Sequence, residues 1–247
     1  MSQTDPDRVF ATGVELMEHN EFGAAREAFS QFIKLTPSNL KSAEARYYEA
    51  FCAVNLYHGD GEKKIEDFVA SNPDHPKAAT AYFDLANFFY AEKNYGRASS
   101  YFSKVDFPTL SNDQHAIGRF HWGYSYFNQR KLDEALDQFN FIKALGGQYG
   151  PATSYYAGFI ELGKEDYENA LIDLKRAEQN KSYSLVVPQL IANVYYKQKK
   201  YDELIVYSKS LEGREGITNP EEISLLTAEA YFKKNEFARA LEGDRKS

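Results

Sequence analysis

Cysteine is nearly absent from this sequence, since Cys52 is the only one among 247 residues. A single cysteine cannot form an intrachain disulfide and cannot supply a cysteine-rich metal site. Cysteine usage therefore gives no information about the redox compartment in which the protein works.

Long apolar runs are also absent. No window of about 18 apolar residues occurs, so the sequence predicts no membrane-spanning helix. The first ten residues, MSQTDPDRVF, lack the apolar segment of a signal peptide. Two explanations are open: the protein is cytoplasmic, or a signal peptide was removed and an initiator methionine added.

Positive charge is scarce. The sequence has 29 Lys and Arg against 36 Asp and Glu, which gives a net charge of -7. Nucleic acids and anionic membranes bind clustered positive charge, and the longest basic cluster is the short segment KQKK at residues 197–200. We therefore expect no nucleic-acid partner and no direct membrane contact.

Motifs that carry chemistry are missing as well. The five histidines include no HExxH and no pair spaced by four residues, and the sequence has no GxxxxGK[ST] or GxGxxG loop. Cys52 lies among aromatic residues without a histidine at helical spacing, as a buried cysteine does. Acidic pairs such as Glu221-Glu222 fall at expected helix starts, where the helix dipole favours them. We expect no enzymatic activity, no catalytic residue, no metal and no cofactor.

Aromatic residues, in contrast, are abundant, with 19 Tyr and 18 Phe. One dense stretch, ARYYEAFCAVNLYHGDGEKKIEDFVASNPDHP, covers residues 45–76. It has two interpretations: a ligand pocket, or one unit of a repeat. The pocket would be built from Tyr47, Tyr48, Phe51, Cys52 and His58.

A period of about 36 residues favours the repeat. An aromatic residue or leucine, followed by a small or apolar residue three positions later, recurs along the chain at Phe22, Tyr95, Leu132, Tyr167, Tyr201 and Phe237. Nine residues before each of these anchors lies a small residue, at Gly13, Ala86, Gly123, Gly158, Ala192 and Ala228. A small residue lets two antiparallel helices approach closely, so each unit is expected to be helix, short turn, helix.

The member missing from this series lies inside the aromatic stretch. Its entry is replaced by HGDGEKKIEDF, in which Ile65 and Phe68 keep helical spacing. Residues 59–61, Gly-Asp-Gly, are expected to form its turn.

Helix starts are well marked. Ser111 with Gln114 predicts a capping box, and Asp74 with Pro76 predicts another start. The pairs Asn219-Pro220 and Gly150-Pro151 predict two more. No segment alternates apolar and polar residues as a strand does, so the fold class is predicted to be all-α.

The pattern resembles the tetratricopeptide repeat, a 34-residue helix-turn-helix unit. Matches to its second helix include Ala25 with Phe29, Ala98 with Phe102 and Ala135 with Phe139, followed in the first unit by Pro37. The resemblance implies one right-handed α-solenoid domain over residues 1–247. The repeats are expected at residues 5–38, 39–74, 75–110, 111–149, 150–183, 184–218 and 219–247.

The seventh unit is expected to be incomplete, turning before Phe237 and stopping within its second helix. Solenoids need a polar capping helix over the last apolar face, and this sequence has none. The chain is therefore expected to be an N-terminal fragment of a longer protein. An open apolar end around Leu225, Tyr231 and Phe237 would favour self-association.

The resemblance also implies a binding groove lined by first-helix residues at positions -3, +1 and +4 from each small residue. The predicted groove residues are Phe10, Tyr47, Phe51, Phe83, Asn87, Tyr90, Phe120, Tyr124, Phe127, Tyr155, Phe159, Gln189, Asn193 and Tyr196. Rings there would give rigid contact area, and asparagine would bond an extended peptide backbone. The alternative is that the rings pack inward against the next repeat. Position -3 holds no basic residue, so a clamp for acidic chaperone tails is not expected.

Four phrases resemble the N-terminal part of long tetratricopeptide proteins of the Gram-negative envelope. They are AEARYYEAFCAVNLY, HPKAATAYFDLANFFY, RFHWGYSYF and SLVVPQLIANVYYKQKKYDELI. This resemblance implies a periplasmic or outer-membrane-associated scaffold if a signal peptide was removed, and a cytoplasmic one otherwise. Two functions stay open: a scaffold that binds a peptide or protein segment, in envelope assembly, or a spacer whose repeats pack on further repeats of the same protein.

Overall fold

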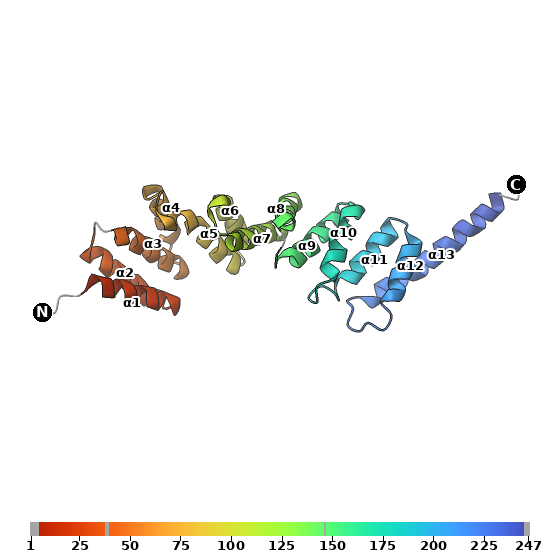
Figure 1. The fold of residues 1–247 in the computed structure, drawn as a ribbon, viewed down its shortest axis with the longest axis horizontal. Coiled ribbons are helices and arrows are strands. Elements are labelled where there is room, and N and C mark those ends of the chain that lie inside the picture. The colour runs from red at the N-terminus through yellow and green to blue at the C-terminus, as the bar shows by residue number, and fades with distance from the viewer. Residues whose placement is uncertain (1–4, 38–39, 146, 245–247) are drawn as a thin grey trace. The chain divides into compact units, whose positions relative to one another are not determined.

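Helices follow one another along the whole described chain, which in this computed structural model comprises residues 5–37, 40–145 and 147–244. The first helices are α1 (Pro6–Glu18), α2 (Phe22–Leu35), α3 (Leu40–Asn55), α4 (Gly61–Ser71), α5 (Pro76–Ala91) and α6 (Tyr95–Phe102). A 3₁₀ turn (Phe107–Thr109) precedes α7 (Asn112–Asn128), α8 (Leu132–Leu145), α9 (Gly150–Gly163) and α10 (Tyr167–Glu178). The last three are α11 (Val187–Lys197), α12 (Tyr201–Ser210) and α13 (Pro220–Asp244) (Figure 1). Within these residues no strand occurs, which confirms the all-α prediction.

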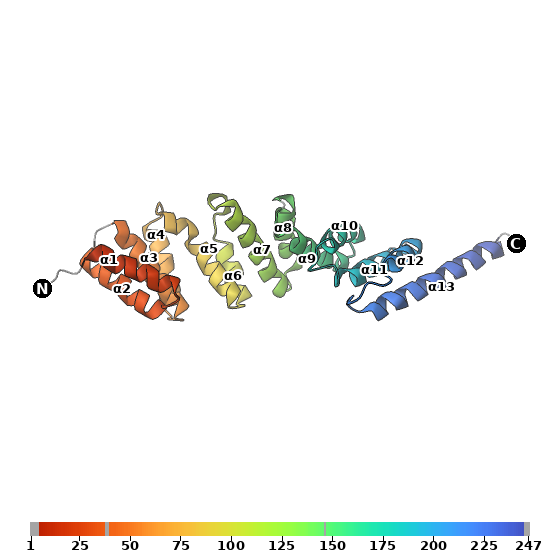
Figure 2. The ribbon, with the colours of Figure 1, turned by 60° about the horizontal axis from the view of Figure 1, so that its bottom comes forward.

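The chain forms two compact units, one up to His121 and one from Trp122. In the first unit α1 packs on α2, α2 on α3, α3 on α4 and α5 on α6. In the second unit α8 packs on α9, α9 on α10 and α10 on α11, and α13 contacts both α11 and α12. In both units each helix therefore lies against its neighbours in the chain, as in a helical repeat (Figure 2).

Close helix contacts follow the predicted small positions. An ideal Cβ on Gly13 would lie 2.8 Å from Cε1 of Phe29, and one on Gly123 would lie 2.7 Å from Cε1 of Phe139. The bulky residue stands sixteen positions after the glycine in both pairs. The prediction that small residues permit close approach of the two helices is confirmed.

The turn inside each repeat uses a left-handed residue that is not glycine. The residue two positions before the second helix has φ between 57° and 63° at Asn20, Lys93, Arg130, Glu165 and Lys199. The next N–H then bonds a carbonyl five residues back, as from Glu21 to Leu16 at 2.8 Å. This Schellman-type closure satisfies carbonyls that the helix end leaves free, which offsets a left-handed cost of about 1–2 kcal/mol.

The second repeat departs from this turn. Its left-handed residue is Tyr57, and α4 begins only at Gly61, so the connection is two residues longer. Gly61 was expected in the turn but is the first residue of α4. An ideal Cβ on Gly61 would lie 2.7 Å from the backbone nitrogen of Val54, so the helix starts where only glycine fits.

Two predicted helix starts can be compared with the structure. The capping box is confirmed, because Gln114 N donates to Ser111 Oγ at 3.3 Å and Ser111 N donates to Gln114 Oε1 at 3.2 Å. The start at Pro76 is also confirmed, but its cap is not Asp74. His75 Nδ1 instead accepts from Lys77 N at 3.1 Å, because His75 is the residue directly before the helix.

The seventh repeat differs most from the prediction. The expected turn before Phe237 is wrong, because α13 runs without interruption from Pro220 to Asp244. A continuous helix satisfies its own backbone, whereas a left-handed turn at Asn235 would need a well-packed second helix to offset its cost. The side chains of residues 236–244 lie outside the described set, and the expected contact of Phe237 falls among them.

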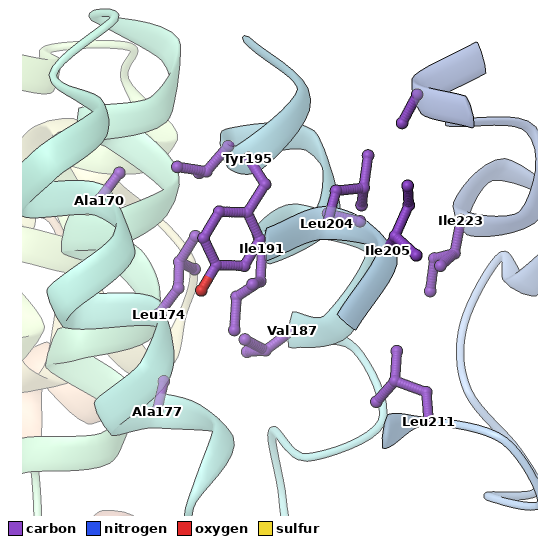
Figure 3. Packing of buried hydrophobic residues seen from close by; sticks show 13 residues of the cluster. Ala170, Leu174, Ala177, Val187, Ile191, Tyr195, Leu204, Ile205, Leu211 and Ile223 are labelled. Carbon is purple, nitrogen blue, oxygen red and sulfur yellow. The ribbon is translucent and has the colours of Figure 1, made fainter. Parts of the chain in front are cut away.

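The core of the second unit joins α10, α11, α12 and α13. Its labelled members in Figure 3 are Ala170, Leu174, Ala177, Val187, Ile191, Tyr195, Leu204, Ile205, Leu211 and Ile223. The second-helix residues Ala170 and Leu174 belong to it, at the positions that Ala25 and Phe29 hold in the first repeat. The same positions therefore build the core in both units.

Candidate functional site

Two of the predicted groove rings belong to the core of the first unit. Tyr47 is 2% exposed and Phe83 is 7% exposed. The Tyr47 hydroxyl donates to the carboxylate of Asp84, and the Phe83 ring lies against Gly118, whose ideal Cβ would be 2.8 Å away. For these two residues the structure follows the alternative of inward packing.

The neighbouring rings are half-buried. Phe10 makes edge contacts with Phe29 and Phe32 at centroid distances of 5.7 and 5.1 Å. Phe51 stacks on Tyr47 at 6.1 Å. These rings keep part of their surface accessible while their orientation is set by core residues.

Asn87 uses both of its polar groups within the first unit. Its Nδ2 donates to Phe83 O at 2.9 Å, and its Oδ1 lies 2.6 Å from His121 Nδ1. The His121 ring stacks on Tyr90 at 3.8 Å, and Phe120 lies 6.2 Å from it. Burial lowers the pKa of His121 to about 4, so the ring is neutral near pH 7 and donates its Nδ1 hydrogen to Asn87.

The second unit brings four predicted residues together on α7 and α9. Phe127 contacts Phe159 edge-on at 5.9 Å, and both Tyr124 and Phe127 contact Tyr156, at 5.3 and 5.1 Å. Tyr155 contacts Tyr156 at 5.1 Å. Phe159 is 41% exposed and the other rings are half-buried. We call this set, with Tyr183, the aromatic face.

Two members of the aromatic face were not predicted. Tyr156 follows Tyr155 on α9, outside the three offsets from the small residue, yet it contacts three of the predicted rings. Tyr183 lies in the connection after α10 and stacks on Tyr155 at 4.9 Å. Only the density of tyrosine near residue 155 hinted at Tyr156, and no periodic signal marked Tyr183.

The predicted polar residues of α11 are tied to α13. Asn193 Nδ2 donates to Glu222 Oε1 at 2.8 Å, and Gln189 Nε2 donates to the other oxygen of that carboxylate. Asn219 Nδ2 in turn donates to Gln189 Oε1 at 2.8 Å. Nearby, the half-buried ring of Tyr196 contacts Tyr201 at 6.0 Å. These amides hold the start of α13 in place.

Comparison with known proteins bears on the fold. No family model matches the sequence, and no curated protein matches it. A solved tetratricopeptide repeat protein from Parabacteroides merdae matches with a TM-score of 0.55 and 10% identity, over 98% of this chain and 91% of that one. PilF of Pseudomonas aeruginosa matches with a TM-score of 0.51 and 15% identity, over 91% and 97%. The chain has the tetratricopeptide repeat fold.

The tetratricopeptide helices also bury a charged cluster that the sequence analysis missed. Lys143 of α8 lies 3.5 Å from Glu161 Oε1 of α9 and forms an ion pair with Asp173 of α10. Both carboxylates are buried, and burial together with Asp173 raises the pKa of Glu161 to about 7. The available signal was that Glu161 is the only charged residue of α9.

Cys52 lies in the core of the first tetratricopeptide unit. Burial raises the pKa of its thiol to about 12, so very little thiolate is present near pH 8. We expect a thiol reagent such as dithionitrobenzoate to leave Cys52 unmodified in the folded protein and to modify one thiol per chain in urea. Equal rates in both conditions would contradict the burial.

Two groups of residues bear on other classes of function. Within the described residues no cluster of three histidine, cysteine or acidic side chains is arranged to hold a metal ion. None of the described helices combines the length and apolarity needed to cross a membrane. The aromatic face is therefore the feature of the tetratricopeptide fold that we take further.

Proposed function

We propose that the chain is a non-enzymatic scaffold that binds a peptide or protein segment on the aromatic face of its second unit. The observation that carries this proposal is the continuous row of ring contacts from Tyr124 through Phe127 to the accessible Phe159. Such rings offer large apolar area and lose little side-chain freedom on binding.

Pre-organisation supports the same conclusion. Each ring of the aromatic face is held by at least one other ring, as Tyr156 is by Tyr124, Phe127 and Tyr155. A partner that contacts them would not have to order them first, which lowers the entropic cost of association.

The chemistry of the face indicates the kind of partner. α9 contains no lysine or arginine, and its one acidic residue, Glu161, is buried. An apolar or aromatic segment would therefore fit the face better than an acidic tail, which needs basic side chains. Tyrosine hydroxyl groups at the rim would add hydrogen bonds to a backbone.

The proposal for the remaining predicted residues is narrower. Because Tyr47 and Phe83 are buried, we assign them a supporting role beneath the half-buried Phe10, Phe51, Tyr90 and Phe120. Asn87, Gln189 and Asn193 hold internal hydrogen bonds, so we assign them to positioning rather than to peptide contact. Tyr196 is half-buried and is kept as a candidate contact.

Loss of the accessible rings should weaken binding without unfolding the protein. We expect Phe159→Ala and Phe127→Ala each to weaken a captured partner by about 1–3 kcal/mol. The partner is captured from an extract of the source cell with immobilised chain, identified, and then titrated as purified protein by calorimetry.

The matched control is Ile172→Ala on α10, which removes an exposed apolar side chain away from the aromatic face. Circular dichroism checks that all three variants stay helical. Unchanged affinity in both ring variants would overturn the assignment, as would an equal loss in the control.

We also propose a place on the periplasmic side of a Gram-negative envelope. The support is the likeness of the phrases at residues 43–57, 75–90, 119–127 and 184–205 to envelope tetratricopeptide proteins. This location would make a segment of an envelope protein the natural partner of the aromatic face.

A further inference from the structure

Helix α13 is apolar on two sides. Ile223 and Ala230 are buried on the side that packs against α11 and α12. On another side Leu225 and Phe232 are each 60% exposed, and Ala228 and Tyr231 are exposed beside them. We call these four residues the open face of α13. A surface helix normally has one apolar face, so a second one calls for a partner.

The repeat register indicates what shape of partner fits. α13 is the counterpart of α11, so Ala228 corresponds to Ala192 and Tyr231 corresponds to Tyr195. In the sixth repeat both counterparts are buried, and α12 packs on α11. The open face is therefore shaped to receive a helix, as α11 receives α12.

The residues that follow in the chain are poorly suited to that role. The position sixteen residues after the small residue holds Phe29, Phe139 or Leu174 in complete repeats, whereas after Ala228 it holds Asp244. A carboxylate cannot fill an apolar contact without a large desolvation cost. Instead of folding back, α13 continues as one helix past the expected turn (Figure 2).

Charge along α13 favours a second copy of the same helix. Within residues 221–235 the acidic residues come first, at Glu221, Glu222 and Glu229, and the lysines follow, at Lys233 and Lys234. An antiparallel copy would bring the acidic part of one helix opposite the basic part of the other, and its helix dipole would also run in the favourable sense.

We propose that the open face of α13 is a dimer interface, in which α13 of a second copy lies antiparallel across a two-fold axis near Ala228. Leu225 of one copy then packs against Tyr231 and Phe232 of the other, and the small Ala228 lets the two helices cross closely. Because the contact is isologous, it closes at two chains.

The oligomeric state of the 247-residue chain tests this interface. In sedimentation equilibrium we expect a concentration-dependent dimer, and we expect Leu225→Glu and Phe232→Glu each to weaken it by about tenfold or more. The matched control, Val206→Glu, places the same charge at an exposed apolar site on α12 and should leave the dimer unchanged. A chain that stays monomeric at all concentrations, or a dimer that tolerates both open-face variants, would overturn the proposal.

A cysteine at the axis gives an independent readout. Ala228→Cys places two thiols close to the two-fold axis, so mild oxidation should give a disulfide-linked dimer. Native Cys52 is buried and contributes no background, and Val206→Cys is the control. No linked dimer in the Ala228→Cys variant, or equal linkage in the Val206→Cys variant, would contradict the axis. The interface is separate from peptide binding, because Phe159→Ala should leave the dimer intact.

Discussion

Replacing Phe139 with alanine should lower the free energy of unfolding of the second unit by about 3–5 kcal/mol. Phe139 is fully buried, it lies against Gly123 and its ring stacks on Tyr156 at 5.8 Å. Gly123 has no side chain that could move into the vacated space. The cavity would therefore stay largely open, which places the cost at the high end for a core residue.

The measurement is urea unfolding followed by circular dichroism, with the midpoint and slope compared between variants. Phe141→Ala is the matched control, because Phe141 lies on the same helix but is 40% exposed, and its cost should stay below about 1 kcal/mol. If both variants shifted the midpoint equally, Phe139 would not be the residue that joins α7 to α8.

Helix boundaries were the most predictable part of the fold. The anchors Phe22, Tyr95, Leu132, Tyr167 and Tyr201 are each the first residue of a second helix in the structure. They could be predicted because one small and one bulky residue must meet at each helix crossing, and this requirement recurs at a fixed spacing.

Turn geometry and burial were less predictable. A left-handed turn at a residue such as Glu165 has no glycine signal, because its cost is offset by hydrogen bonds that form only in the folded repeat. Offsets along one helix identify its faces but not what covers them. Tyr47 is buried through Asp84 of the next repeat, 37 residues away, and a period within one sequence gives no direct record of such a pair.

The candidate site shows the same limit. The offsets correctly brought together Tyr124, Phe127, Tyr155 and Phe159, because these lie on adjacent first helices. They missed Tyr183, which reaches the face from a connection with no period. The buried Glu161 was also unexpected, since a charged residue on a helix is usually solvated and its partners lie on two other helices.

Removing the buried lysine should have an equally large effect. We expect Lys143→Met to cost about 3–5 kcal/mol of stability at pH 8, because Glu161 and Asp173 would then share a buried site without a cation. Lys164→Met is the control, since its ion pair with Asp133 is exposed and should be worth about 1 kcal/mol or less. The same urea experiment compares the two variants.

The pH dependence identifies the group responsible. Glu161 has a folded-state pKa of about 7, above the ordinary value of 4.5, so the native state holds a proton that the unfolded state has lost. The stability linked to Glu161 is complete below pH 4.5 and is lost as the pH rises to about 7. At full amplitude this loss is on the order of 3 kcal/mol. Glu161→Gln should remove this part of the pH profile and stabilise the protein at pH 8.

The double variant separates charge from packing. If Lys143→Met acts by leaving two unneutralised carboxylates, then adding Glu161→Gln should recover much of the lost stability at pH 8 and little at pH 5, where Glu161 is already protonated. If Lys143 acts through its aliphatic stem, the two changes should add at both pH values. A purely additive result would therefore exclude the electrostatic explanation while leaving the burial of the cluster unchanged.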